Sequence, residues 1–350
     1  MADGAITRHE TFAAKVAIVA FAVIAALLVF ALRHVLLLIF GAILIAVGLR
    51  GLAQAIERVA PIGHRASMAF AALLVLGVIG GAIWLLGAQI AAQIAQMLEA
   101  LPGAWRNFRD TVSQTGYGAA LIAEIENASG VGAQLGAFAS RVGAYTMTFA
   151  GATLQFLLVI VAATFFALNP LTYRNGLLML IPQRRRARIG EALKATTAAL
   201  RRWLLGTLVS MLFLATVLTL GLWALGVPAP LALGVLAGLS QFVPIIGPVL
   251  ASAPAILLGL SVSPETAIWV ALLYLIASQI EANIVFPLIL QRAVSLPPGL
   301  TLFSAIGFGL LLGPLGVLFS APLTVAISVF VVMFYVRGVL GDEHAPIPGG

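Results

Sequence analysis

The stretch "SQIEANIVFP" (Ser278–Pro287) places four polar side chains, including the carboxylate of Glu281, inside a long apolar run. The segments on either side, "IWVALLYLIA" (268–277) and "LIL" (288–290), are almost entirely apolar. A helix needs about 20 apolar residues to cross the hydrocarbon core of a membrane. The run from 266 to 290 therefore predicts a membrane-spanning helix that carries polar groups in its interior.

The composition extends this prediction to the whole chain. Of its 350 residues 62% are hydrophobic and only 9% are charged, and the mean hydropathy is +1.11. These values indicate a polytopic membrane protein rather than a soluble domain. The absence of cysteine excludes disulfides, thiolate metal sites and thiol nucleophiles.

Apolar runs of spanning length recur along the chain, and we predict an all-α fold of about eight transmembrane helices. "PIIGP" (244–248) divides the sixth run and "GPLG" (313–316) divides the eighth, so each is either a kinked span or a re-entrant hairpin. The predicted runs are 12–32, 35–56, 66–88, 146–168, 203–227, 231–260, 266–290 and 300–336.

The distribution of basic residues predicts the orientation. Eight Lys and Arg residues against the single acid Glu191 separate the fourth span from the fifth, which is typical of a cytoplasmic segment. An alternative for "QRRRAR" (183–188) is a patch that binds anionic lipid or nucleic acid, but the positions beside apolar spans favour topology and no nucleic-acid partner. With eight crossings both termini are cytoplasmic, as expected in a bacterial inner membrane. The predicted units are 1–88 (three spans), 89–145 (a small extracytoplasmic helical insert), 146–202 (the fourth span and a basic cytoplasmic loop), 203–337 (the core transport spans) and 338–350 (a cytoplasmic tail). We expect the insert to pack between subunits, with a lid over a ligand as the alternative role.

The opening stretch has two polar faces. On an ideal helix Tyr274, Ser278 and Glu281 share one face, whereas Gln279 and Asn283 lie on another, so both faces cannot point to lipid. A carboxylate at mid-membrane costs about 2.5–3.5 kcal/mol on insertion scales. We therefore expect Glu281 to face protein or a water-filled cavity, where it can bind a polar solute, a cation or a proton.

Pro287 adds a backbone effect to these side chains. Proline lacks an N–H and clashes with the carbonyl four residues earlier, so a kink would free the carbonyl of Asn283 near Glu281. The alternative is that Glu281 pairs with Arg292 and only stabilises packing.

The sixth run predicts a second set of pathway groups within 238–260. If the segment were otherwise helical, Pro244 would free the carbonyl of Ser240 and Pro248 that of Pro244. Broken helices near the midplane are a means by which transporters build sites from backbone. The residues selected on this basis are Ser240, Gln241, Pro244, Gly247 and Pro248.

An internal echo links the two divided runs. "GPVLASAP" (247–254) and "GPLGVLFSAP" (313–322) both lead from Gly-Pro to Ser-Ala-Pro. The echo favours two comparable hairpins or broken helices that face one site, the second beginning at Gly313 and Pro314.

Patterns for enzymatic chemistry are absent from the sequence. The four histidines lie at or beyond the ends of the predicted spans, and neither a phosphate-binding loop nor a GxSxG elbow occurs. We therefore predict no enzyme, no cofactor and no metal site.

The ordered motifs of the second half resemble the autoinducer-2 exporter family of permeases. The similarity lies in "LGVPAPLALGVLAGLSQFVPIIGPVLASAPA" (225–255) and "IASQIEANIVFPLILQRAVSLPPGLTLFSAIGFGLLLGPLGVLFSAPL" (276–323). The resemblance implies secondary transport by homo-oligomers, such as pentamers, with export of autoinducer-2 or cation/proton antiport. Asn169 and Thr207 depart from the family pattern, which often has Asp and Gln there. The candidate residues that the resemblance carries over are Pro244, Gly247, Pro248, Gln279, Glu281, Asn283 and Pro287.

The sequence thus predicts a secondary transporter that exports a small polar solute, such as an autoinducer-2-like signal, with H⁺ or Na⁺ coupling through Glu281. A monovalent cation/proton antiporter is the alternative within transport. From another class, a non-transporting oligomeric scaffold would tolerate Glu281→Gln but not changes at Trp105 or Arg106.

Overall fold

The computed structural model describes residues 30–60, 63–77, 158–289 and 297–347, with scattered positions between 20 and 28 and between 81 and 113. The first predicted span and the external insert lie largely outside the described residues, and Arg292 lies wholly outside them. Every described element is helical, which confirms the all-α prediction. The labelled elements are α2 (Arg33–Val59), α6 (Pro170–Met179), α7 (Gln183–Ala224), α8 (Pro230–Ser240), α9 (Ile246–Val262), α10 (Pro264–Ile280), η1 (Glu281–Val285), α11 (Phe286–Ile289), α12 (Pro298–Leu312), α13 (Pro314–Leu318), α14 (Ser320–Phe330) and η2 (Val331–Val336).

Three helices of the described part are long and apolar enough to cross a membrane. These are Arg33–Val59, Gln183–Ala224 and the continuous helix Pro264–Val285. Shorter apolar helices, including His64–Gly77 and Leu158–Leu168, pack beside them. The architecture is that of a polytopic membrane protein.

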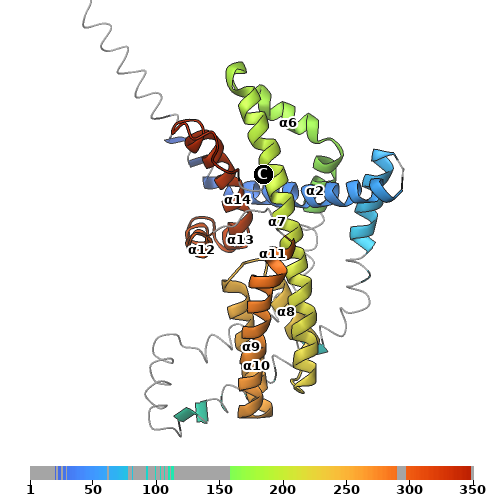
Figure 1. Cartoon of the computed structure of the whole chain (residues 1–350), viewed down its shortest axis with the longest axis vertical. Helices are drawn as coiled ribbons and strands as arrows, with labels where there is room; N and C mark the ends of the chain where they lie inside the picture. Colours follow the sequence, from blue (N-terminus) through green and yellow to red (C-terminus); the bar gives the residue numbers. More distant parts are fainter. Residues whose placement is uncertain are drawn as a thin grey trace, which may run out of the picture.

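Helix α7 is the longest described element and differs from the sequence prediction in one respect. The basic segment before the fifth span was predicted as a loop, but α7 runs unbroken for 42 residues through it. The segment contains no proline after Pro182, and its Ala, Leu, Arg and Lys residues are strong helix formers. The basic and apolar halves of α7 therefore form one continuous helix (Figure 1).

Helices α8 and α9 form a hairpin against α7 and α10, so the sixth run does not cross as a straight helix. Gly234 of α8 lies against Thr219 of α7, and Gly238 lies against Met211, so α8 runs antiparallel to α7. Gly259 near the end of α9 lies against Ala267 near the start of α10. The hairpin therefore starts and ends near the same end of the bundle. Because α8 has 11 residues, it is about 16 Å long, roughly half of the hydrocarbon core.

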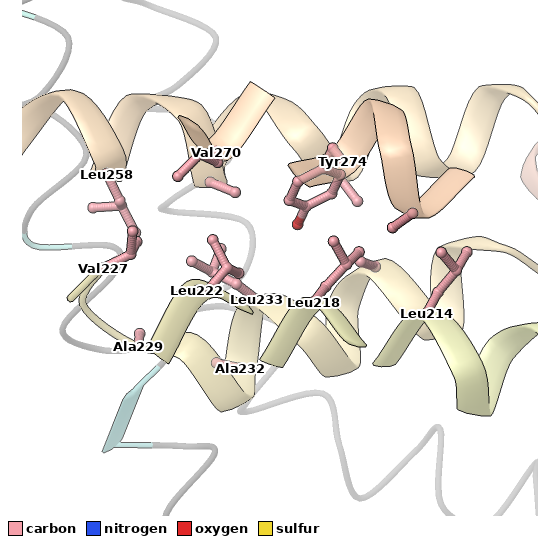
Figure 2. Packing of buried hydrophobic residues seen from close by; sticks show 14 residues of the cluster. Leu214, Leu218, Leu222, Val227, Ala229, Ala232, Leu233, Leu258, Val270 and Tyr274 are labelled. Carbon is pink, nitrogen blue, oxygen red and sulfur yellow. The ribbon is translucent and has the colours of Figure 1, made fainter. Parts of the chain in front are cut away.

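The hairpin and its neighbours share one apolar core. In Figure 2 the side chains of Leu214, Leu218 and Leu222 from α7 point toward Val270 and Tyr274 of α10. Gly234 and Gly238 form a GxxxG pair, which lets the backbones of α8 and α7 approach closely. A Cβ at Gly238 would lie only 2.6 Å from the Met211 carbonyl oxygen. Close packing thus fixes the depth at which the hairpin ends.

The second divided run also breaks where the sequence predicted. Gly313 has φ +76°, a conformation that favours glycine, and it separates α12 from the short helix α13. Phe319 follows α13 and packs edge-on against Phe242 of the first hairpin, with ring centroids 6.5 Å apart. Phe242 also contacts Trp203 of α7 at 5.5 Å. The two broken segments therefore meet, as the internal echo suggested.

Candidate functional site

A polar cluster lies where the hairpin turn meets α7 and the end of α10. The Ser210 hydroxyl donates a hydrogen bond of 2.5 Å to Oε1 of Glu281. The side chain of Gln241, at the hairpin turn, lies beside this carboxylate. Three segments that are distant in the sequence thus converge on one carboxyl group.

The cluster is enclosed by protein. Glu281 is 6% exposed, Gln241 8% and Ser210 0%. No ion pair to Glu281 is present in the part of the chain that the structure describes. Ser210 lies 14 residues before the end of α7, which is about 21 Å along the helix axis and thus within the span. The prediction that Glu281 faces protein rather than lipid is therefore confirmed. A carboxyl group with only neutral partners at such a depth is suited to bind a proton or a small cation.

The backbone changes from an α-helix to a π-helix at Glu281, the residue that carries the carboxylate. From Glu281 to Val285 the chain is a π-helix, and the N–H of Phe286 donates to the carbonyl of Glu281. A wider turn accommodates Pro287, which cannot donate a backbone hydrogen bond in the next position. The predicted disturbance by this proline thus takes the form of a π-turn, a feature that occurs frequently at functional sites.

The hairpin turn between α8 and α9 contains Pro244, Gly247 and Pro248. Ile245 has φ +69° and ψ −61°, and the N–H of Ile246 donates to the Pro244 carbonyl at 2.8 Å. This geometry is a γ-turn of the rare, strained kind, and positive φ is unusual for a β-branched residue. Gly247 lies directly against the Ser240 carbonyl, where a side chain would not fit.

The prediction of free carbonyls in this turn was wrong. The Ser240 carbonyl accepts from the N–H of Val243 at 3.0 Å, and the Pro244 carbonyl accepts from Ile246. The reason is that the segment is a turn and not an interrupted helix, so short-range hydrogen bonds replace the missing helical ones. The turn contributes the side chain of Gln241 to the site and not those two carbonyls.

Six other candidates lie outside the polar cluster. Asn283 Nδ2 donates to the carbonyl and to Oε1 of Gln279, both at 2.9 Å, and both side chains are exposed on the other face of the helix, as the two-face pattern predicted. The Ser240 hydroxyl donates to the Ala237 carbonyl in its own helix at 2.7 Å. Ser278 is half-buried on the inner side of α10. Gly313 and Pro314 form the second break, which approaches the first through Phe319.

Ser210 is the partner that the sequence analysis missed. It is one of four hydroxyl residues in the apolar part of α7, and such residues commonly donate to their own helix, so nothing local marks it. Thr207, buried one turn earlier, is the residue that departs from the family pattern. The hydroxyl of Tyr274, two turns before Glu281, is buried and has no hydrogen-bond partner in the part of the chain that the structure describes. Its oxygen points toward α7 in Figure 2.

A double-mutant cycle measures the link between Ser210 and Glu281. We expect Ser210→Ala and Glu281→Ala, which each remove the hydrogen bond, to show a coupling energy of about 1.5–3 kcal/mol, the range for hydrogen bonds to charged groups. Unfolding of the four proteins in detergent provides the measurement. Ser261→Ala is the control, because the Ser261 hydroxyl donates only to Leu258 of its own helix. Additive effects, within about 0.5 kcal/mol, would contradict a functional hydrogen bond between the two side chains.

Spanning helices, a hairpin that ends inside the bundle and a buried carboxylate at its turn are typical of membrane transporters. The family comparison agrees, because the model of the AI-2E family transporter matches residues 16–335. The chain belongs to this family, which confirms the resemblance seen in the sequence.

Curated bacterial relatives are similar over part of the chain, and each is named as a transport protein on a provisional basis. YrrI of Bacillus subtilis (strain 168) is 27% identical over 155 residues, 44% of this chain and 44% of that protein. YueF of the same organism is 29% identical over 125 residues, 36% and 34% of the two chains. YhhT of Escherichia coli (strain K12) is 31% identical over 177 residues, half of each chain. The chain thus matches at most half the length of these relatives.

Proposed function

We propose that the protein is a secondary transporter that exports a small polar solute, with Glu281 binding the coupling H⁺ or Na⁺. The observation that carries this proposal is the buried carboxylate of Glu281, which accepts from Ser210 and lies beside Gln241 at the turn of the hairpin. Because its described partners are neutral, binding or release of one positive charge changes the electrostatics of the whole cluster. The adjoining strained turn at Ile245 is a backbone element suited to respond to that change.

The side chains of the polar cluster also suit the proposed polar solute. Hydroxyl, amide and carboxyl groups match a small molecule rich in hydroxyl groups, which is the class to which autoinducer-2 belongs. The unpartnered hydroxyl of Tyr274 adds a fourth group on the same helix face. Trp203 and Phe242 supply apolar surface next to the turn. The assignment to an autoinducer-2-like signal rests on the family and on this fit.

Cation/proton antiport is a second candidate, supported by the composition of the cluster. A carboxylate oxygen, an amide oxygen and a hydroxyl oxygen are hard ligands, the type that alkali cations prefer. In that case the same Glu281 would exchange a cation for a proton without an organic solute.

The orientation is part of the proposal. Arg188 at the basic start of α7 donates to the Met333 carbonyl at 2.8 Å, so the last helix ends beside the basic segment. We place this side in the cytoplasm of a bacterial inner membrane because Lys and Arg are enriched on cytoplasmic segments. Both termini are then cytoplasmic, and the hairpin enters from outside.

Flux into and out of liposomes tests the proposed function. The purified protein is expected to move autoinducer-2 under an imposed pH or Na⁺ gradient, whereas protein-free liposomes are not. Ion flux without any organic solute would favour the antiporter. Absence of both, with correct insertion shown by protease protection, would contradict transport.

The exposed amide side chains of Gln279 and Asn283 are the reason that the proposed function includes a homo-oligomer. Their hydrogen-bonded amides lie exposed beside the apolar side chains of Ile276, Ile280 and Ile284 on the same span. Amide side chains in membranes commonly hydrogen-bond across helix interfaces. We infer that this pair faces a second copy of the chain, in pentamers or another ring.

The double variant Gln279→Leu, Asn283→Leu is expected to shift the protein toward monomers, because each interface hydrogen bond contributes about 0.6–2 kcal/mol. Native mass spectrometry at matched detergent concentration measures the distribution. Asn175→Leu, which changes an exposed amide of α6, is the control. An unchanged distribution would contradict the assignment of this face to the interface.

A further inference from the structure

A cavity separate from the polar cluster lies between α2, α6 and α7. Its volume is about 460 Å³, within the range of ligand pockets. Four basic side chains line it, and no acidic residue does. These are Arg50 of α2, Arg174 of α6, and Lys194 and Arg201 of α7.

The basic groups are held in place but not neutralised. Arg201 Nη1 donates to Gln54 Oε1 at 2.6 Å, and Arg174 Nη2 donates to the Gly190 carbonyl at 3.3 Å. Nε of Arg50 and Nε of Arg174 are buried and find no hydrogen-bond partner among the described residues. None of the four forms an ion pair within the described ranges. Buried donors without acceptors and four uncompensated charges indicate a site for an anion.

The rest of the lining is apolar. Ile43, Val47, Phe166 and Leu193 form part of the wall. The cavity lies where α2 and α7 each change from an apolar to a basic sequence. The apolar part of α2 ends at Leu49 and that of α7 begins at Trp203. That transition is the level of lipid head groups, where basic pockets between helices bind anionic phospholipids. Charge and position together select an anion that carries hydrocarbon chains.

We propose that this cavity binds the phosphate head group of an anionic phospholipid, with the start of its acyl chains against the apolar wall. The three guanidinium groups match phosphate oxygens with paired hydrogen bonds, and Lys194 adds a fourth donor group. The lipid thereby connects α2 and α6 to the basic half of α7. This site is independent of Glu281 and does not depend on the proposed transport.

Native mass spectrometry of the delipidated protein tests the proposal with phosphatidylglycerol and phosphatidylcholine of identical acyl chains. The unaltered protein is expected to retain phosphatidylglycerol selectively. The variant Arg50→Gln, Lys194→Gln is expected to bind it roughly tenfold or more weakly, since each basic residue contributes to the attraction. The control Arg184→Gln, Arg185→Gln removes the same charge from exposed positions of α7 outside the cavity. It should bind like the unaltered protein.

Further measurements distinguish a phospholipid from inorganic phosphate as the ligand. A single variant covers the case in which the double variant does not fold. Inorganic phosphate is expected to leave the melting temperature unchanged at concentrations where phosphatidylglycerol raises it. Equal stabilisation by both would overturn the lipid and identify a soluble anion site. Equal loss of lipid in the control would overturn the cavity in favour of general surface attraction. If the double variant does not fold, Lys194→Gln alone decides, because that side chain is exposed and its substitution leaves the helix intact.

Discussion

Replacing Glu281 with Gln is expected to reduce gradient-driven flux to the level of protein-free liposomes. The substitution keeps the size of the side chain and its ability to accept from Ser210, but removes the group that can bind a proton or cation. Glu281 is the one buried acidic residue in the described part of the chain, so no other buried carboxylate replaces it at the site. Solute counterflow without a gradient, measured on the same liposomes, separates loss of coupling from loss of the solute pathway.

Glu265→Gln is the matched control. Glu265 lies exposed in the first turn of the same helix, so its replacement changes the net charge equally without altering the cluster. We expect its flux to equal that of the unaltered protein. Full gradient-driven flux by Glu281→Gln, at equal incorporation, would show that Glu281 only stabilises packing and would contradict the proposed coupling role.

The second large effect is expected for Gly247→Ala at the hairpin turn. An added Cβ would overlap the Ser240 carbonyl, with the Ser240 carbonyl carbon only 2.5 Å away. Backbone atoms cannot rotate aside as a side chain can, so the turn must open and move Gln241 away from Glu281. We expect a loss of about 3 kcal/mol, the upper end of overpacking costs, and a flux close to background.

Gly307→Ala provides the comparison for this prediction. A Cβ at Gly307 of α12 meets nothing within 4 Å, so its replacement should be neutral or stabilising by up to about 1 kcal/mol. Thermal unfolding in detergent and flux in liposomes are measured for both variants. An unaltered melting temperature and flux for Gly247→Ala would show that the turn adapts and that its geometry does not position Gln241.

Local sequence pattern was enough to predict some residues of the site but not others. Glu281 could be identified because a carboxylate in an apolar run must find protein or water around it. Gln241 could be selected because it precedes a cluster of prolines and glycine. Ser210 could not, since it lies 71 residues from Glu281 and a single serine in a spanning helix has no distinctive signal. The separation of Gln279 and Asn283 from Glu281 followed from helical periodicity and agrees with their exposed positions.

By itself the sequence determined the membrane class, the all-α fold, the positions of both breaks and the burial of Glu281. Each of these depends on hydropathy, helical periodicity or proline chemistry, which act over a few residues. Only the tertiary structure decided that the sixth run is a hairpin, that the basic segment continues α7, and that Ser210 and Gln241 meet Glu281. These features depend on close approach of distant helices, such as α8 on α7 at Gly234 and Gly238, and such packing is decided by the shapes of both partners together.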